Sequence, residues 1–390
     1  MDVVDLAITE PPSSSLLKNE RTAIKLQPET IGDQPQKNYH LVDCVQNDDP
    51  TTHTNTNTKQ SYIMLPPERF WTRSMELILR LMTTRTNASK NNAKKNRQKH
   101  KIIVFFELTS LARLYSRFLS LRLGHTVGVW ELHGKMHQRE RSVASRRFRD
   151  ASNGVLLTSD VSARGVDYPG VTHVVQIGSP RNRETYIHRV GRTGRAGNSG
   201  EGLLILPQLL DDDHDKPQQL QQLGNDLEDL ELVHDESLER AMCSRKRNPQ
   251  RILLENELEM LRHDLKTETD TTGMAEAVIL AYQSLISYYF QTSRRQRIRD
   301  DESSSGSQQL QPEASVVANF LNQLVADFGL PELPAIGFQR AKSMGISHLG
   351  GQLNIRKNWQ DHYQYNHGLD DDGTNFRRPR GGTDDWFGLS

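Results

Sequence analysis

Cysteine is scarce in this chain of 390 residues, which has only Cys44 and Cys243. The two lie too far apart in sequence to indicate a metal site, and a reduced intracellular protein is the simplest interpretation. No apolar run approaches the roughly 18 residues that a membrane-spanning helix needs. The first residues, MDVVDLAITE, are acidic, unlike a secretory or mitochondrial presequence. We therefore expect no membrane partner.

An excess of charge of either sign is also missing. The 49 basic and 49 acidic residues cancel, so a nucleic-acid partner has to be inferred from local patches. The phosphate-binding pattern G-x-x-x-x-G-K-[ST] is missing as well. The nearest candidate, HGKM at 133–136, lacks the first glycine at the right spacing and the hydroxyl that would bind magnesium.

The most informative stretch is 154–197. Its two short apolar runs, 155–157 and 174–177, are bounded by turn formers and predict buried parallel strands. Ligands bind beyond the carboxyl ends of such strands. A short helical segment follows with four functional candidates: His188, Arg189, Arg192 and Arg195. Arginines three residues apart are expected to share one helical face, and closely spaced guanidinium groups suit a polyphosphate or a nucleic-acid backbone.

Four motifs here resemble those of the DEAD-box RNA helicases. SDVSARGVD and YIHRVGRTGRAG resemble motifs V and VI, IIVFFELTSLA resembles motif IV, and HGKMHQRER resembles motif IVa. They follow the family's order and spacing over residues 61 to about 207. The resemblance implies an α/β fold, namely the second of the family's two RecA-like domains, built on a parallel sheet.

The same resemblance implies which residues hold RNA. Arg141 occupies the last position of the family's HGxxxQxxR motif, which includes Gly134, and would contact the RNA backbone. Thr158 and Asp160 would help to hold the strand, with Thr158 bonding a phosphate. A neutral hydroxyl is suited to a phosphate oxygen.

A second implied set faces the nucleotide. Gly165 and Asp167 would face ATP, with Asp167 reaching a ribose hydroxyl. Arg192 and Arg195 match two arginines that reach across the cleft to the γ-phosphate. Such arginine fingers increase the rate of phosphoryl transfer by a factor of about 10³–10⁵.

The resemblance also implies a partner domain. His188 and Arg189 match residues that contact the first RecA-like domain and couple RNA binding to hydrolysis. That domain would carry the phosphate loop, the Asp-Glu-Ala-Asp motif and the ligands of Mg²⁺, and the chain shows neither motif. We expect the C-terminal part of a longer ATP-dependent helicase that unwinds or remodels RNA duplexes, inactive as an ATPase by itself.

Composition divides the chain into four predicted parts. They are a mostly disordered linker (1–58), the helicase C-terminal domain (59–208), a small all-α C-terminal extension (209–350) and a flexible tail rich in basic and aromatic residues (351–390). Within the helicase domain, 61–65 is predicted as an edge strand and 68–82 and 109–123 as helices. A further helix is predicted to open at His133-Gly134. The basic segment 85–101 and the tail are either solvated or in contact with RNA phosphates.

The extension is expected to contain amphipathic helices over 274–290 and 314–328. Its order of a tyrosine-rich helix, an arginine cluster and a second helix resembles the C-terminal extension of fungal mitochondrial DEAD-box proteins that remodel introns. This resemblance implies that the protein is located in the mitochondrial matrix, with the nucleus, nucleolus or cytoplasm as alternatives.

Two other functions remain open. The chain could act alone as a non-catalytic RNA-binding module, a reading motivated by the missing phosphate loop. It could also be a helicase domain that has become a platform for protein interactions. A binding screen with and without RNA distinguishes these possibilities.

Overall fold

The computed structural model describes residues 58–83, 100–124, 127–160, 166–195, 197–209, 232–266, 272–302 and 312–356. All of them belong to one compact unit of residues 49–390. The predicted linker up to residue 57, most of the basic segment (84–99) and the tail from 357 lie outside the described residues.

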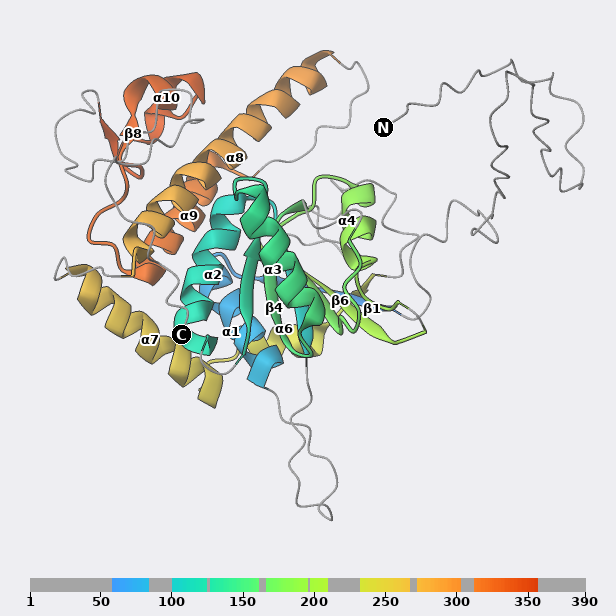
Figure 1. Cartoon of the computed structure of the whole chain (residues 1–390). Coiled ribbons are helices and arrows are strands. Elements are labelled where there is room, and N and C mark those ends of the chain that lie inside the picture. Colours follow the sequence, from blue (N-terminus) through green and yellow to red (C-terminus); the bar gives the residue numbers. More distant parts are fainter. Residues whose placement is uncertain are drawn as a thin grey trace, which may run out of the picture. The chain divides into compact units, whose positions relative to one another are not determined.

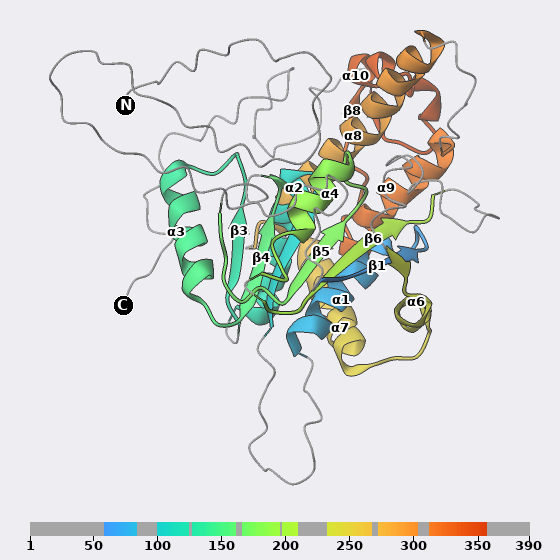
Figure 2. The same ribbon diagram turned by 90° about the vertical axis from the view of Figure 1, so that its right-hand side faces the viewer.

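Within the described residues, seven parallel strands form one sheet in the order β3-β4-β2-β5-β6-β1-β7. Figure 1 shows this sheet among the helices, and Figure 2 labels five of its strands. Their bounds are β1 Thr58–Leu65, β2 Lys101–Phe106, β3 Val129–Leu132, β4 Gly154–Thr158, β5 His173–Ile177, β6 Gly200–Pro207 and β7 Val233–His234. The predicted α/β fold with a parallel sheet is confirmed.

The prediction that 61–65 forms an edge strand is wrong. β1 lies between β6 and the two-residue strand β7, which pairs with Ser61 and Tyr62. The His234 ring stacks on the Tyr62 ring with centroids 4.9 Å apart. Two residues carry no detectable strand period, so the sequence does not reveal β7.

The helices are α1 Phe70–Thr83, α2 Thr109–Leu123, α3 Gln138–Asp150, α4 Arg183–Val190, α6 Glu236–Cys243, α7 Pro249–Lys266, α8 Met274–Glu302, α9 Ala314–Phe328 and α10 Phe338–Ser343. α2 and α9 have their predicted bounds. α3 begins at Gln138 rather than at His133-Gly134. The prediction named neither α6 nor α7.

Helices cover both faces of the sheet, and the side chains of β2 pack against helices on both sides. All six of its residues are buried. Ile102, Val104 and Phe106 pack with α1 and α2, whereas Ile103 and Phe105 pack with Phe148 of α3 on the other side. Alternate residues of a strand point to opposite faces, so the stretch Ile102–Phe106, which is buried on both faces, is apolar throughout. α4 packs on the same face as α3.

The extension joins the core on the α1/α2 face. α7 and α9 lie against α1, and α8 lies against α2 (Figures 1 and 2). Buried residues of these three helices belong to the same apolar cluster as those of α1 and α2. Trp71 of α1 stacks on Phe320 of α9 with ring centroids 4.8 Å apart, and its indole nitrogen donates to the Phe320 carbonyl at 3.2 Å.

The extension is not entirely helical. Two short strands, β8 Ile336–Gly337 in the extension and β9 Ile355–Arg356 at the start of the predicted tail, form a separate parallel pair. In the described part of the chain, no helix is both long enough and apolar enough to cross a membrane.

Candidate functional site

A buried ion-pair cluster joins α4 to the carboxyl ends of the central strands. Arg189 of α4 is fully buried, and its guanidinium donates to Asp160 Oδ1 and to Glu107 Oε1, each at 2.7 Å. Asp160 lies two residues after β4 and Glu107 directly after β2. The exposed Arg181 also reaches Glu107, at 3.3 Å. The cluster therefore connects a predicted RNA-binding residue, Asp160, to a predicted coupling residue, Arg189.

Glu107 was missed by the sequence analysis. Its side chain is 5% exposed, and burial raises the pKa of its carboxyl group although two arginines lie beside it. A carboxylate in this position requires its guanidinium partners, because a buried charge is costly unless it is paired. The available signal was an acidic residue directly after the apolar run Ile102–Phe106.

A second cluster forms where α4 ends. Arg192 donates to the carbonyl oxygens of Val166, at 2.8 Å, and His188, at 3.2 Å. Arg195 donates to the Gly191 carbonyl at 2.6 Å and pairs with Asp167 Oδ1 at 2.9 Å. The two predicted arginine fingers and the predicted ribose ligand therefore lie together. Gly165, the other residue predicted to face the nucleotide, lies outside the described residues.

The predicted arrangement of the three arginines on one helical face is wrong. α4 ends at Val190, and Gly191 is its C-cap. Gly194 has φ of 67°, in the left-handed region that favours glycine, so the chain turns there. Arg189 consequently points into the protein, whereas Arg192 and Arg195 turn towards residues 166 and 167.

The electrostatics of this second cluster suit an anion. Burial, followed by the nearby charge of Arg195, lowers the pKa of Arg192. Asp167 is the carboxylate paired with Arg195, and its side chain is 68% exposed. Two adjacent guanidinium groups fit the phosphates of a nucleotide, and a nearby carboxylate fits a sugar hydroxyl. Among the described residues, no group of His, Cys, Asp and Glu side chains could hold a metal ion.

The predicted RNA residues lie at the ends of β3 and β4 and on α3. The Thr158 hydroxyl is buried and donates to the carbonyl of Leu132 on the paired strand, at 2.6 Å. A bond from this hydroxyl to a phosphate would require it to leave that carbonyl. Gly134 is exposed in the turn after β3. Arg141 is half-buried in α3, and its Nε has no hydrogen-bond partner among the described residues.

His188, the other predicted coupling residue, is half-exposed on α4. Its Nδ1 lies 3.7 Å from Glu184 Oε1, one helical turn earlier. His188 and the buried Arg189 are sequence neighbours with different surroundings. His188 is therefore accessible to a partner, whereas Arg189 is buried and contacts Glu107 and Asp160.

Part of this chain is similar in sequence to known helicases. Residues 76–197 match the helicase conserved C-terminal domain. The chain is 37% identical over 184 residues to the mitochondrial ATP-dependent RNA helicase mss116 of Aspergillus fumigatus, covering 44% of this chain and 27% of the relative. It is 36% identical over 177 residues to the mitochondrial ATP-dependent RNA helicase cyt-19 of Neurospora crassa, covering 45% of this chain and 27% of the relative.

The similarity of fold extends further along the chain. The Mss116p DEAD-box helicase domain 2 bound to an RNA duplex aligns with 77% of this chain and 100% of its own, with a TM-score of 0.51 and 21% identity. Because 77% of the chain is more than residues 1–208 can supply, that alignment includes part of the extension as well as the sheet. The match spans only about a quarter of the curated relatives' length. Residues 76–197 of the chain therefore match the helicase conserved C-terminal domain, and the curated relatives similar to it are ATP-dependent RNA helicases.

Proposed function

We propose that this chain is the second RecA-like half of an ATP-dependent RNA helicase, which unwinds or remodels RNA duplexes. In this proposal Arg192 and Arg195 stabilise the charge that develops on the γ-phosphate of ATP held by a first RecA-like domain. Asp167 would bind the ribose. The observation that carries the proposal is that Arg192 and Arg195, just past the end of α4, turn towards the segment that contains Asp167.

RNA would be held through its backbone by Gly134, Arg141, Thr158 and Asp160. Most contacts of this kind go to phosphates and sugars and carry no sequence information. The ion pair between Asp160 and Arg189 offers a physical path for coupling. An RNA strand that moves Asp160 acts on Arg189, and through it on α4, whose end places Arg192.

A chimeric enzyme tests the arginine-finger role. The chain from residue 58 is joined behind the first RecA-like domain of the Neurospora crassa relative, and RNA-stimulated ATP hydrolysis is measured. We expect Arg192→Ala to lower turnover by about 10³ or more, with RNA affinity retained. Arg240→Ala is the matched control, because Arg240 is 79% exposed on α6 and far from the cluster in sequence. Unchanged turnover in Arg192→Ala would refute the assignment.

The alternative proposal is a non-catalytic RNA-binding module. It is favoured by the placement of Gly134, Arg141 and Asp160 within this one unit, since their positions need no second domain. It predicts RNA binding by the isolated chain and no gain of ATP turnover in the chimera.

Mitochondrial localisation is also a proposal. Both fungal relatives carry the word mitochondrial in their names. A fluorescent fusion of the full-length gene product in its own cells tests it, and a signal confined to the nucleus or cytoplasm would contradict it.

A further inference from the structure

A short basic loop joins α6 to α7, with the sequence SRKRN at 244–248. Its three consecutive cationic residues, Arg245, Lys246 and Arg247, are exposed. Arg247 pairs with Glu255 at 3.4 Å, and both side chains remain largely in solvent. Within the described ranges, Arg245 and Lys246 have no acidic partner.

The backbone of this loop is clamped by Arg251. This arginine is 1% exposed, and its guanidinium donates to the carbonyl oxygens of Ser244, of Lys246 at 2.9 Å and of Met242 at 3.2 Å. Its Nε donates to Glu76 of α1 at 2.9 Å. The loop is therefore held in one shape, with its cationic side chains left outside.

Asn248 adds to the clamp from within the loop. Its amide donates to Glu76 Oε1 at 2.7 Å, and its side-chain oxygen accepts the Arg251 backbone N–H at 2.9 Å. Little conformational entropy remains to be lost when the loop binds a ligand, which favours affinity.

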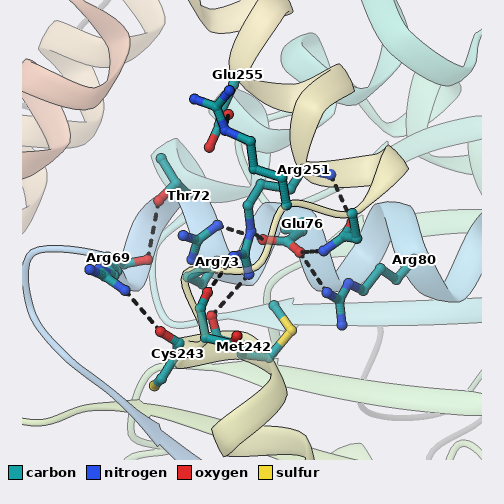
Figure 3. Close-up of polar contacts among 12 residues, drawn as sticks. Arg69, Thr72, Arg73, Glu76, Arg80, Met242, Cys243, Arg251 and Glu255 are labelled. Atoms are coloured by element: carbon teal, nitrogen blue, oxygen red, sulfur yellow. Dashed lines mark hydrogen bonds and ion pairs between the residues drawn. The ribbon is translucent and has the colours of Figure 1, made fainter.

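The charged groups around the clamp include more guanidinium groups than carboxylates. Glu76 is shared by three guanidinium groups, those of Arg73, Arg80 and Arg251, all within 2.9 Å (Figure 3). One carboxylate cannot neutralise three cations, so these guanidinium groups keep an excess of positive charge beside the clamped backbone of the loop. Adjacent uncompensated cations repel one another, and a polyanion relieves that repulsion.

The basic loop lies apart from the predicted RNA residues. It is fastened to α1, on the face of the sheet opposite α3 and α4. Figures 1 and 2 show the α6–α7 connection well away from α4. A short RNA bound along α3 and α4 does not reach it, whereas a long or folded RNA can.

We propose that the basic loop 245–247 is a second RNA contact, which holds the phosphate backbone of a distant segment of the same RNA. This inference rests on the proposed function and adds a second RNA-binding surface to the protein. Arginine pairs bidentately with phosphate oxygens, and a regular row of phosphates matches a clamped row of cations. Simultaneous contact at two surfaces raises affinity for long RNA without new contacts at the helicase motifs.

The test compares two fluorescein-labelled RNAs by anisotropy over a range of salt concentrations. One is a single strand of about 10 nucleotides and the other a folded RNA of about 60 nucleotides, long enough to engage both surfaces. We expect the triple variant R245Q/K246Q/R247Q to bind the long RNA about tenfold more weakly at low salt and to reduce its salt slope by about 2. Its affinity for the short strand should stay within about twofold.

Matched variants separate the possible outcomes. Glu255→Gln removes the carboxylate beside Arg247 and should tighten long-RNA binding, whereas Arg240→Gln, an exposed arginine on α6, should change it little. Thermal unfolding of the triple variant should match that of the unmodified chain, because the clamp uses backbone carbonyl groups.

Three results would overturn the proposal. An unchanged salt slope in the triple variant, while Arg141→Ala weakens both RNAs, would reject the loop and keep the proposed function. Failure of the unmodified chain to bind either RNA would reject both. Equal displacement of long RNA by poly-glutamate of the same charge would identify an acidic protein as the ligand instead.

Discussion

At the scale of single residues, Asp327 of α9 is a carboxylate that opposes folding at neutral pH. It is buried, with one oxygen accepting from Gln323 at 2.7 Å and the other without a partner among the described residues. Burial raises the pKa of Asp327 from 3.8 to about 6. The folded chain thus holds this proton more tightly than the unfolded chain, and the unfolding free energy falls as the pH rises from 3.8 towards about 6.

We predict that Asp327→Asn raises the unfolding free energy by about 1–3 kcal/mol at pH 8, since one pKa unit corresponds to about 1.4 kcal/mol. The difference in unfolding free energy between Asp327→Asn and the wild type should disappear at a pH near 4, where the wild-type carboxyl group is protonated. Urea unfolding at the two pH values measures both effects. Asp150→Asn, at an exposed position on α3, is the control. An equal difference at both pH values would show that ionisation is not the cause.

Single residues also show what sequence patterns can and cannot predict about the site. The motif predicted Arg189, Arg192 and Arg195, because their type and spacing are local properties. The partner of Arg189 could not be predicted, since Glu107 lies 82 positions earlier and meets it only when β2 and α4 pack. The separate directions of the three arginines follow from the end of α4 at Gly191, which periodicity does not fix.

At the scale of elements, one carboxylate attaches α7 to α1. Burial alone would raise the pKa of Glu76, but hydrogen bonds from Arg251, Asn248 and Arg73 outweigh it and hold the pKa below its ordinary 4.5. Its contribution to stability is therefore complete at neutral pH and is lost as the pH falls through the lowered pKa.

We predict that Glu76→Gln lowers the unfolding free energy by about 3–5 kcal/mol at pH 7, because buried guanidinium groups lose their counter-charge. Chemical denaturation is the measurement. Glu236→Gln is the comparison, since the pair of Glu236 with Arg240 is exposed on both sides and exposed pairs contribute little. Equal small losses in the two variants would mean that the buried network does not hold α7 in place.

Long, strongly periodic elements were the ones that the sequence predicted best. α2 and α9 matched their predicted bounds because apolar residues recur along each helix and a loop or glycine ends it. α7 was not predicted, since exposed Ile252, Leu253 and Met260 blur its apolar stripe. β7 was missed because two residues form a strand only beside β1.

At the scale of the whole molecule, the sheet and the extension share one core. Apolar residues of α7, α8 and α9 are buried with those of α1 and α2 in a single cluster. The predicted boundary at 208–209 between two domains can therefore be tested by counting the unfolding transitions of the chain. A shared core unfolds in one cooperative step, whereas independent domains unfold in two.

We predict that thermal unfolding is a single transition, with the same midpoint by circular dichroism and by tryptophan fluorescence. Phe320→Ala should lower that midpoint for the entire chain, because loss of a large aromatic side chain costs about 3–5 kcal/mol and Phe320 stacks on Trp71. Leu121→Ala, at a 50% exposed position on α2, is the control. Two separated transitions, with only the later part of the chain affected by Phe320→Ala, would support independent domains.

The most direct test of the central claim is RNA binding by the purified chain, measured by anisotropy alongside ATP turnover with and without structured RNA. The account predicts salt-dependent RNA binding that Arg141→Ala weakens, without ATP turnover. RNA-stimulated turnover by this chain alone would contradict the expectation that phosphate binding and magnesium belong to another domain. Absence of RNA binding at low salt would contradict the proposed function itself.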